Sequence, residues 1–133
     1  MPRAELKRRI DAIESGYEFM LAFAAQGVRD DRDSPTGGQL RKALADMAQA
    51  LDGLPEALEA IVTDGGLQPA DAFRAYAGVL RRDAEATLAA VELVRSREAV
   101  SSQLVDNLNA SMHLRGLLTD LFLIDEALKD SIK

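Results

Sequence analysis

Residues 40–61 read LRKALADMAQALDGLPEALEAI, and this stretch decides the fold class. Its large apolar residues recur at intervals of four and three, at Leu40, Leu44, Met47, Leu51, Leu54, Leu58 and Ile61. Residues spaced in this way share one face only in an α-helix. The same spacing recurs near the N-terminus, at Leu6, Ile10, Ile13, Tyr17, Met20 and Ala24. The sequence therefore predicts helices that pack along heptad-like apolar seams.

Pro55 lies inside the first of these patterns, shortly after Gly53. A proline inside a helix removes one backbone hydrogen bond and clashes with the preceding turn. The apolar spacing keeps its phase across Pro55, whereas a loop would usually reset it. We therefore expect residues 39–63 to form one helix with a kink, and a split into two helices at Pro55 is the alternative.

Three further helical segments are expected, over residues 4–26, 68–96 and 97–129. Gly27 suits the left-handed cap that ends the first helix, and residues 64–66 (Asp-Gly-Gly) end the second. Four helices with short connections predict an all-α, antiparallel up-down-up-down four-helix bundle, as a single domain over residues 1–133. Residues 28–38 are polar and rich in glycine, which is typical of a flexible loop.

Composition excludes several classes of function. The net charge is −6, from 16 basic and 22 acidic residues, whereas sequence-independent binding to nucleic acid needs a basic surface. The absence of cysteine excludes disulfides, iron–sulfur clusters and cysteine-ligated zinc. The longest stretch without charge is residues 19–28, far short of the ~20 residues that span a bilayer. We therefore expect a cytoplasmic protein that binds neither nucleic acid nor membrane.

The last predicted helix carries two apolar stripes, roughly 140° apart on a helical wheel. This offset indicates either an interruption near His113 or different packing neighbours for the two halves. Residues 117–124 include six apolar residues in eight, which is wider than a one-sided stripe and favours a homodimer interface. Phe19 and Phe23 lie off the main seam of the first helix, where they pack either against another bundle helix or against a partner. The predicted interface comprises Phe19, Phe23, Leu117, Leu121, Phe122 and Ile124.

The first half of that helix is unusual because Asp106 is its only charged residue between positions 99 and 114. Exposed helical faces normally carry charged residues, so uncharged polar ones favour contact with something other than bulk water. In an up-down bundle, Tyr17 lies near the same level, with a hydroxyl that needs a partner. We therefore predict a polar, ligand-binding cluster of Tyr17, Glu18, Asp106, Asn109 and His113.

No catalytic, metal or cofactor site is predicted. His113 is the only histidine, so it cannot supply the paired Glu-x-x-His ligands of a di-iron site. Residues 30–33 lack the glycine and the terminal glutamate of a calcium loop, and no nucleophile elbow or phosphate loop occurs. Phosphotransfer through His113 is a remote alternative. Histidine phosphotransfer domains also carry a basic residue and a glycine after their histidine, but Arg115 and Gly116 stand one position closer to His113 than in those domains.

The sequence thus favours a non-enzymatic helical-bundle interaction protein that acts as an adaptor, regulatory or assembly factor. We expect it to form a homodimer and leave room for another protein partner. The alternative is a small-ligand-binding or sensor bundle whose polar pocket lies around Tyr17, Asn109 and His113.

Overall fold

A computed structural model describes residues 2–64 and 66–130, and within these ranges the chain contains helices and no strand. In chain order the elements are α1 (Pro2–Ala24), the 3-10 turn η1 (Asp31–Asp33), α2 (Gly37–Asp52), α3 (Leu54–Thr63), α4 (Ala70–Arg95), α5 (Ser102–Ala110) and α6 (Met112–Asp130). They pack compactly around one apolar core. The predicted all-α class is confirmed.

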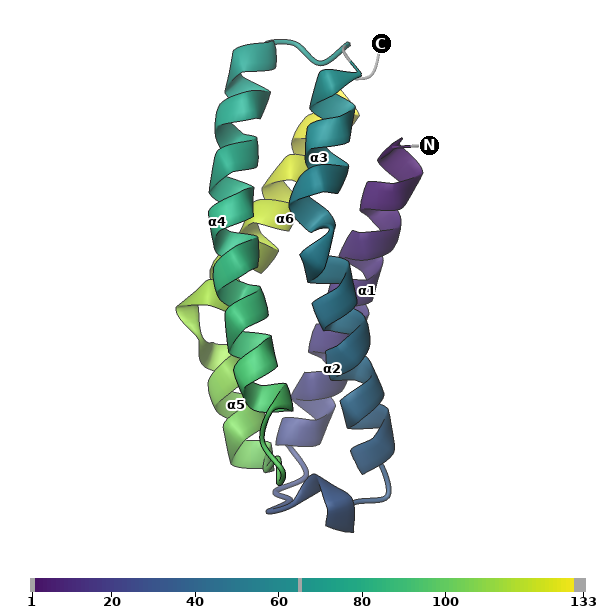
Figure 1. Cartoon of the computed structure of the whole chain (residues 1–133), viewed down its shortest axis with the longest axis vertical. Helices are drawn as coiled ribbons and strands as arrows, with labels where there is room; N and C mark the ends of the chain where they lie inside the picture. Colours follow the sequence, from purple (N-terminus) through teal and green to yellow (C-terminus); the bar gives the residue numbers. More distant parts are fainter. Residues whose placement is uncertain (1, 65, 131–133) are drawn as a thin grey trace.

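The helices lie side by side along one long axis (Figure 1). From the N-terminus α1 descends, α2 and α3 ascend one after the other, α4 descends, and α5 and α6 ascend. α1 packs against α2, α3 and α5, whereas α4 packs against α2, α3 and α6. The last helix therefore lies mainly against α4 and not against α1.

The two seams that the sequence predicts form one part of the core, and buried residues of α4, α5 and α6 form most of the rest. All seven residues of the pattern between positions 40 and 61 are buried. Of the N-terminal seam, Tyr17 and Ala24 are only half-buried, and the other members are buried. Because full burial of one such side chain contributes roughly 1.5–3 kcal/mol, these seams supply much of the stabilisation.

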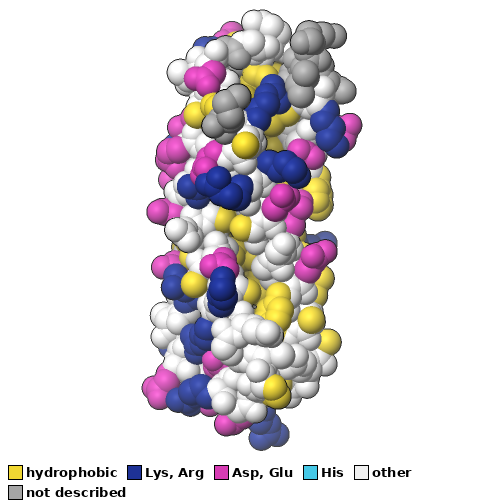
Figure 2. All heavy atoms as spheres, turned by 90° about the vertical axis from the view of Figure 1, so that its right-hand side faces the viewer, with side chains coloured by type: hydrophobic (Ala, Val, Ile, Leu, Met, Phe, Trp, Pro, Cys, Tyr) yellow, Lys and Arg dark blue, Asp and Glu magenta, His cyan; other side chains and the backbone are white. Residues whose placement is uncertain are grey.

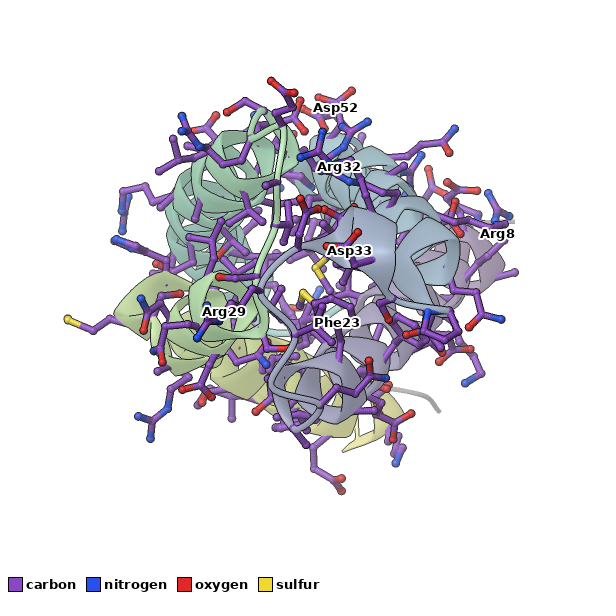
Figure 3. The ribbon with its side chains drawn as sticks, turned by 90° about the horizontal axis from the view of Figure 1, so that it is seen from below. Arg8, Phe23, Arg29, Arg32, Asp33 and Asp52 are labelled. Carbon is purple, nitrogen blue, oxygen red and sulfur yellow. The ribbon has the colours of Figure 1, made fainter. Side chains whose placement is uncertain are left out.

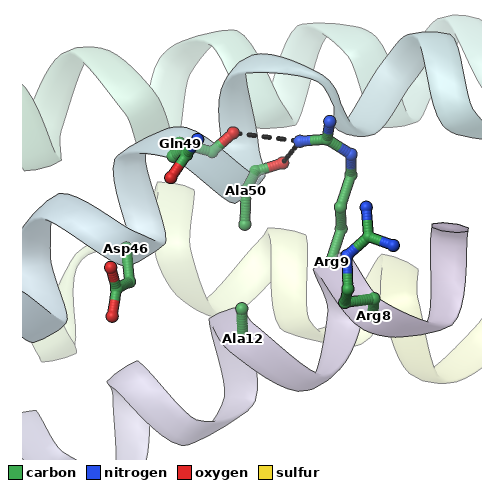
Figure 4. A pocket seen from close by; sticks show the side chains of 6 residues that line it. All are labelled: Arg8, Arg9, Ala12, Asp46, Gln49 and Ala50. Carbon is green, nitrogen blue, oxygen red and sulfur yellow. Dashed lines mark hydrogen bonds between the residues drawn. The ribbon is translucent and has the colours of Figure 1, made fainter.

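α2 and α3 form one bent helix, with the bend at Gly53 and Pro55 in the first turn of α3. At that position a missing N–H leaves no acceptor unsatisfied. Arg9 reaches across from α1, and its Nη1 donates to the carbonyl oxygens of Gln49 (3.0 Å) and Ala50 (3.2 Å), as Figure 4 shows. A Cβ on Gly53 would come within 2.5 Å of this guanidinium group, so glycine makes room for it. The expected kink is present, two residues before Pro55.

The last predicted helix is interrupted at Ser111, whose backbone is extended (φ −63°, ψ 143°). The Ser111 hydroxyl accepts a hydrogen bond from the N–H of Leu114 (3.3 Å), which caps the start of α6. One continuous helix over residues 97–129 was therefore a wrong expectation. The interruption near His113, which the offset between the two apolar stripes indicated, is confirmed.

Glycines end two of the predicted helices. Gly27 has φ +69°, the left-handed conformation expected of it, although α1 already ends at Ala24. Gly66 has φ +84° and follows α3, while Gly65 lies outside the described residues.

The segment between α1 and α2 is anchored at the lower end of the molecule, which Figure 3 views from below. Asp31 is buried and accepts hydrogen bonds from Arg41 Nε (2.8 Å) and from the N–H of Val100 (2.8 Å). Arg41 also donates to the carbonyl oxygens of Arg95, Arg97 and Glu98. Burial alone would raise the pKa of Asp31, but the hydrogen bonds from Arg41 and Val100 lower it below its usual value. Flexibility of residues 28–38 stays a prediction, and α2 already begins inside this range, at Gly37.

In the described part of the chain, no helix combines the length and the apolar character that crossing a membrane requires.

Candidate docking groove between α1 and α6

A groove of about 550 Å³ runs between α1 and α6, and we call it the α1–α6 groove. Its α1 wall consists of Glu14, Tyr17, Glu18 and Leu21, and its α6 wall of Arg115, Leu118, Thr119 and Phe122. On each helix these residues are spaced by one, three or four positions, so each wall is one helix face.

The groove exists because the two halves of the final segment lie against different helices. α5 packs against α1, but α6 is held to α4. The hydroxyl of buried Thr87 on α4 lies 2.7 Å from the carbonyl oxygen of Asp83 in its own helix and 2.9 Å from that of His113 in the first turn of α6, so its one hydrogen is shared between the two. Further along, the Tyr76 hydroxyl donates to Asp120 Oδ1 (2.8 Å). The break at Ser111 thus lets α6 diverge from α1 and leaves the facing sides of these two helices uncovered.

Large apolar side chains are exposed at this groove. Leu21 is 47% exposed and Phe122 is 61% exposed, and the neighbouring Leu123 is 55% exposed. Leu118 is buried at the base of the α6 wall. Figure 2 views the molecule from the side of α1 and shows hydrophobic patches among charged side chains, along the middle and the right-hand edge of this face. Large apolar side chains exposed in a hollow that charged residues surround are typical of an interaction site.

The charges of the groove differ in sign between its walls. Glu14 and Glu18 lie on α1, and Arg115 lies on α6. None of the three forms an ion pair with another residue in the described part of the chain. Burial, together with the nearby carboxylates of Asp11, Asp125 and Glu18, raises the pKa of Glu14, although Lys7 acts in the opposite direction. The groove therefore carries two glutamates on its α1 wall and one arginine on its α6 wall, and none of the three is paired within the described part of the chain.

The structure brings together only part of the predicted ligand cluster. Tyr17 and Glu18 line the α1–α6 groove, whereas Asp106 lines a separate hollow beside Arg29. His113 is exposed, and Asn109 is buried with neither side-chain nitrogen nor oxygen hydrogen-bonded. Among the described residues, no hydrogen bond joins Tyr17 to Asp106, Asn109 or His113. The prediction assumed that one continuous helix sets the height of each residue along the bundle. The break at Ser111 moves His113 away from the position that this assumption gives.

The predicted interface also divides into two groups. Phe122 lines the groove, and Phe19 is half-buried beside Gly16 and Lys42 in another hollow. The other four members are buried in the core of the single chain, namely Phe23, Leu117, Leu121 and Ile124. These four were wrongly placed on a surface. Helix periodicity identified them as apolar but could not distinguish the core of the chain from an interface between chains.

Sequence reasoning missed a buried carboxyl group, that of Asp120, at the contact between α4 and α6. Asp120 is 7% exposed, accepts the Tyr76 hydrogen bond at Oδ1, and has no hydrogen-bond donor at Oδ2. Burial first, and then the neighbouring carboxylate of Asp83, raise the pKa of Asp120 to about 6, against the opposite effect of the Tyr76 hydrogen bond. Burial and contact with Asp120 also raise the pKa of Tyr76 to about 12. The available signal was Tyr76 itself, which lies in the apolar pattern of its helix with a hydroxyl that needs a partner.

In the ranges that the structure describes, no three or more acidic, histidine or cysteine side chains are grouped as metal ligands would be. Comparison of the chain with protein-family models, with curated proteins and with solved structures finds no match.

Proposed function

We propose that this chain is a non-enzymatic interaction protein, an adaptor, regulatory or assembly factor, which docks its partner in the α1–α6 groove. The observation that carries the proposal is the exposure of Leu21 and Phe122 on the two facing walls of this groove. We also propose that the fold is an antiparallel up-down-up-down four-helix bundle, in which α2–α3 and α5–α6 each count as one helix.

The proposed partner is a second copy of this chain. A groove between two helices accepts the apolar face of a third helix, which is a common mode of protein recognition. A second copy can supply that face, because its own α6 presents Phe122 and Leu123 to the outside. The opposite charges on the two walls also favour an association in which each copy offers both signs.

Sedimentation velocity on the full chain, over 1 to 100 µM, tests this proposal. We expect the wild-type chain to dimerise and Phe122→Asp to be monomeric, because a carboxylate would be buried without a partner. Leu93→Asp is the matched control, since Leu93 is 64% exposed on α4 and does not line the groove. A wild-type monomer throughout this range, or a Phe122→Asp dimer as tight as the wild type, would refute the proposal.

One observation favours the alternative of small-ligand binding. The volume of the groove, about 550 Å³, lies within the range of about 300–1,000 Å³ that is typical of ligand pockets, and Tyr17 and Glu18 line it. Native mass spectrometry of the chain purified from its own host distinguishes the two functions. A bound mass of a few hundred daltons that is lost in Tyr17→Phe supports the ligand, and a dimer mass without addition supports self-association.

A further inference from the structure

We infer that two copies pack with a two-fold axis parallel to the length of the helices, so that α6 of each copy covers α1 of the other. This inference rests on the proposed self-association and adds the orientation of the copies and the residues that select it. These residues are Arg115 and Glu18. Arg115 of each copy faces Glu18 of the other, so the two-fold axis generates the same opposite-charge contact twice.

A helix pair of this kind can meet a second copy of itself about either of two symmetry axes. In a two-fold interface, if residue i contacts residue j of the partner, then residue j contacts residue i. An axis parallel to the helices exchanges the two walls and places each α6 on the partner's α1. An axis perpendicular to the helices within the interface places α1 on α1 and α6 on α6. The charge on each wall decides between these arrangements.

Charge complementarity favours the parallel axis. With this axis, Arg115 on α6 faces the acidic α1 wall of the other copy, and the contact occurs twice. With the perpendicular axis, Glu14 and Glu18 face the same acidic wall of the partner, and like charges placed together disfavour association. Both Glu18 and Arg115 lack an ion pair within the described part of their own chain, so a new pair replaces no existing one.

The parallel axis also brings Arg115 of one copy and Glu18 of the other to similar heights along the molecule. Rotation about an axis parallel to the helices leaves each residue at its own level. Because α1 descends and α6 ascends, Glu18 in the later part of the α1 wall lies near the level of Arg115 at the start of the α6 wall, and a long arginine side chain spans the remaining offset. The exposed Leu21 and Phe122 then lie between the two copies, where contact removes their apolar surface from water.

Glu18, and not Glu14, is the acidic partner that we assign to Arg115. Glu14 lies near Asp11 and Asp125, and the influence of Asp125 places it toward the end of the groove that is remote from Arg115. The two helices run in opposite directions, so Arg115 at the start of α6 lies nearer to Glu18 than to Glu14 along α1.

Charge reversal in two separately purified chains tests the orientation. Arg115→Glu alone creates two Glu–Glu contacts in its own homodimer, and Glu18→Arg alone creates two Arg–Arg contacts. We expect each variant to self-associate about tenfold more weakly, or worse, than the wild type. A mixture of the two variants restores an opposite-charge pair at both positions, so we expect a heterodimer within about threefold of the wild-type affinity.

Fluorescently labelled chains and sedimentation velocity measure these affinities, and circular dichroism checks that each variant is helical. Arg82→Glu on α4 is the matched control, because Arg82 is exposed, forms no ion pair in the described part of the chain and lies outside the groove. If either reversal unfolds the chain, Arg115→Asp with Glu18→Lys provides a second pair of variants.

The outcomes separate this inference from the proposed function. Weak homodimers and a restored heterodimer support the orientation. Suppose that Phe122→Asp abolishes the wild-type dimer, but that charge reversal leaves it unchanged or that mixing the two variants does not restore it. This result overturns the orientation and still supports docking in the groove. A wild-type monomer at all concentrations overturns both.

Discussion

Replacing Asp120 by asparagine is expected to stabilise the protein at neutral pH. In the native structure this carboxyl group is buried between α4 and α6, with Asp83 beside it and the Tyr76 hydroxyl donating to Oδ1 at 2.8 Å. Asparagine has nearly the same shape and no charge. Its amide oxygen can accept from Tyr76, and its amide nitrogen can donate to Asp83, so the substitution removes the repulsion and keeps the hydrogen bond.

The magnitude follows from the pKa of Asp120, which is about 6 in the folded chain against a usual value of 3.8. The folded state binds this proton more tightly than the unfolded state does, so the free energy of unfolding falls as pH rises from about 4 to about 6. Above pH 6 the free energy of unfolding stays lower by the full amount of this decrease. At 1.36 kcal/mol per pKa unit it amounts to about 3 kcal/mol, and we expect Asp120→Asn to recover about 1–3 kcal/mol at pH 7.5.

Urea unfolding of the wild type and of Asp120→Asn, followed by circular dichroism at several pH values, measures this difference. The difference should be largest at pH 7.5 and should close toward zero at pH 4, where Asp120 is protonated in the wild type. Asp106→Asn is the matched control, since Asp106 is exposed and its substitution should change stability by less than about 0.5 kcal/mol. A destabilised Asp120→Asn at pH 7.5, or a difference that does not vary with pH, would refute the reasoning.

Two further predictions concern the lower end of the molecule. Arg41→Met should lower the free energy of unfolding by about 3 kcal/mol, because it leaves the buried Asp31 carboxylate without its cation; Lys42→Met, which breaks only an exposed pair with Asp46, should change it by less than about 1 kcal/mol in the same urea titration. Gly37→Ala should be strongly destabilising, because its Cβ would lie 1.9 Å from the carbonyl oxygen of Asp31, whereas Gly38→Ala meets nothing within 4 Å and should be neutral or stabilising in a thermal melt. Equal effects within either pair of variants would contradict the corresponding contact.

The helices were predictable because their information is local. The spacing of Leu40, Leu44 and Met47 specifies a helix face whatever lies opposite, and this face is buried. The bend between α2 and α3 was also accessible, since Pro55 marks it in the sequence. The break at Ser111 was only half accessible, because the offset of two apolar stripes indicates a change of direction without locating its residue. Its position also depends on a tertiary contact, the hydrogen bond from Thr87 to the carbonyl oxygen of His113.

The candidate site was much less predictable, because a groove depends on how far apart two helices lie in the tertiary structure. Tyr17, Glu18 and Phe122 were each selected from the sequence, but for two different predicted sites. Their common groove depends on α6 lying against α4, which no periodicity within α6 can specify. The contact between Tyr76 and Asp120 spans 44 positions, and it was missed for the same reason.

Helix geometry explains why Phe122 and Leu123 lie outside the core of the single chain. Leu117, Leu121, Ile124 and Leu128 are spaced by four, three and four, and all are buried on the inner face of α6. At 100° per residue, Phe122 and Leu123 then point about 100° and 200° away from Leu121, outside the reach of the core. No rotation of α6 would bury them without exposing the inner stripe. Most of the apolar surface at these two positions therefore stays outside the core of the single chain, and the docked helix that we propose would cover Phe122 in the groove.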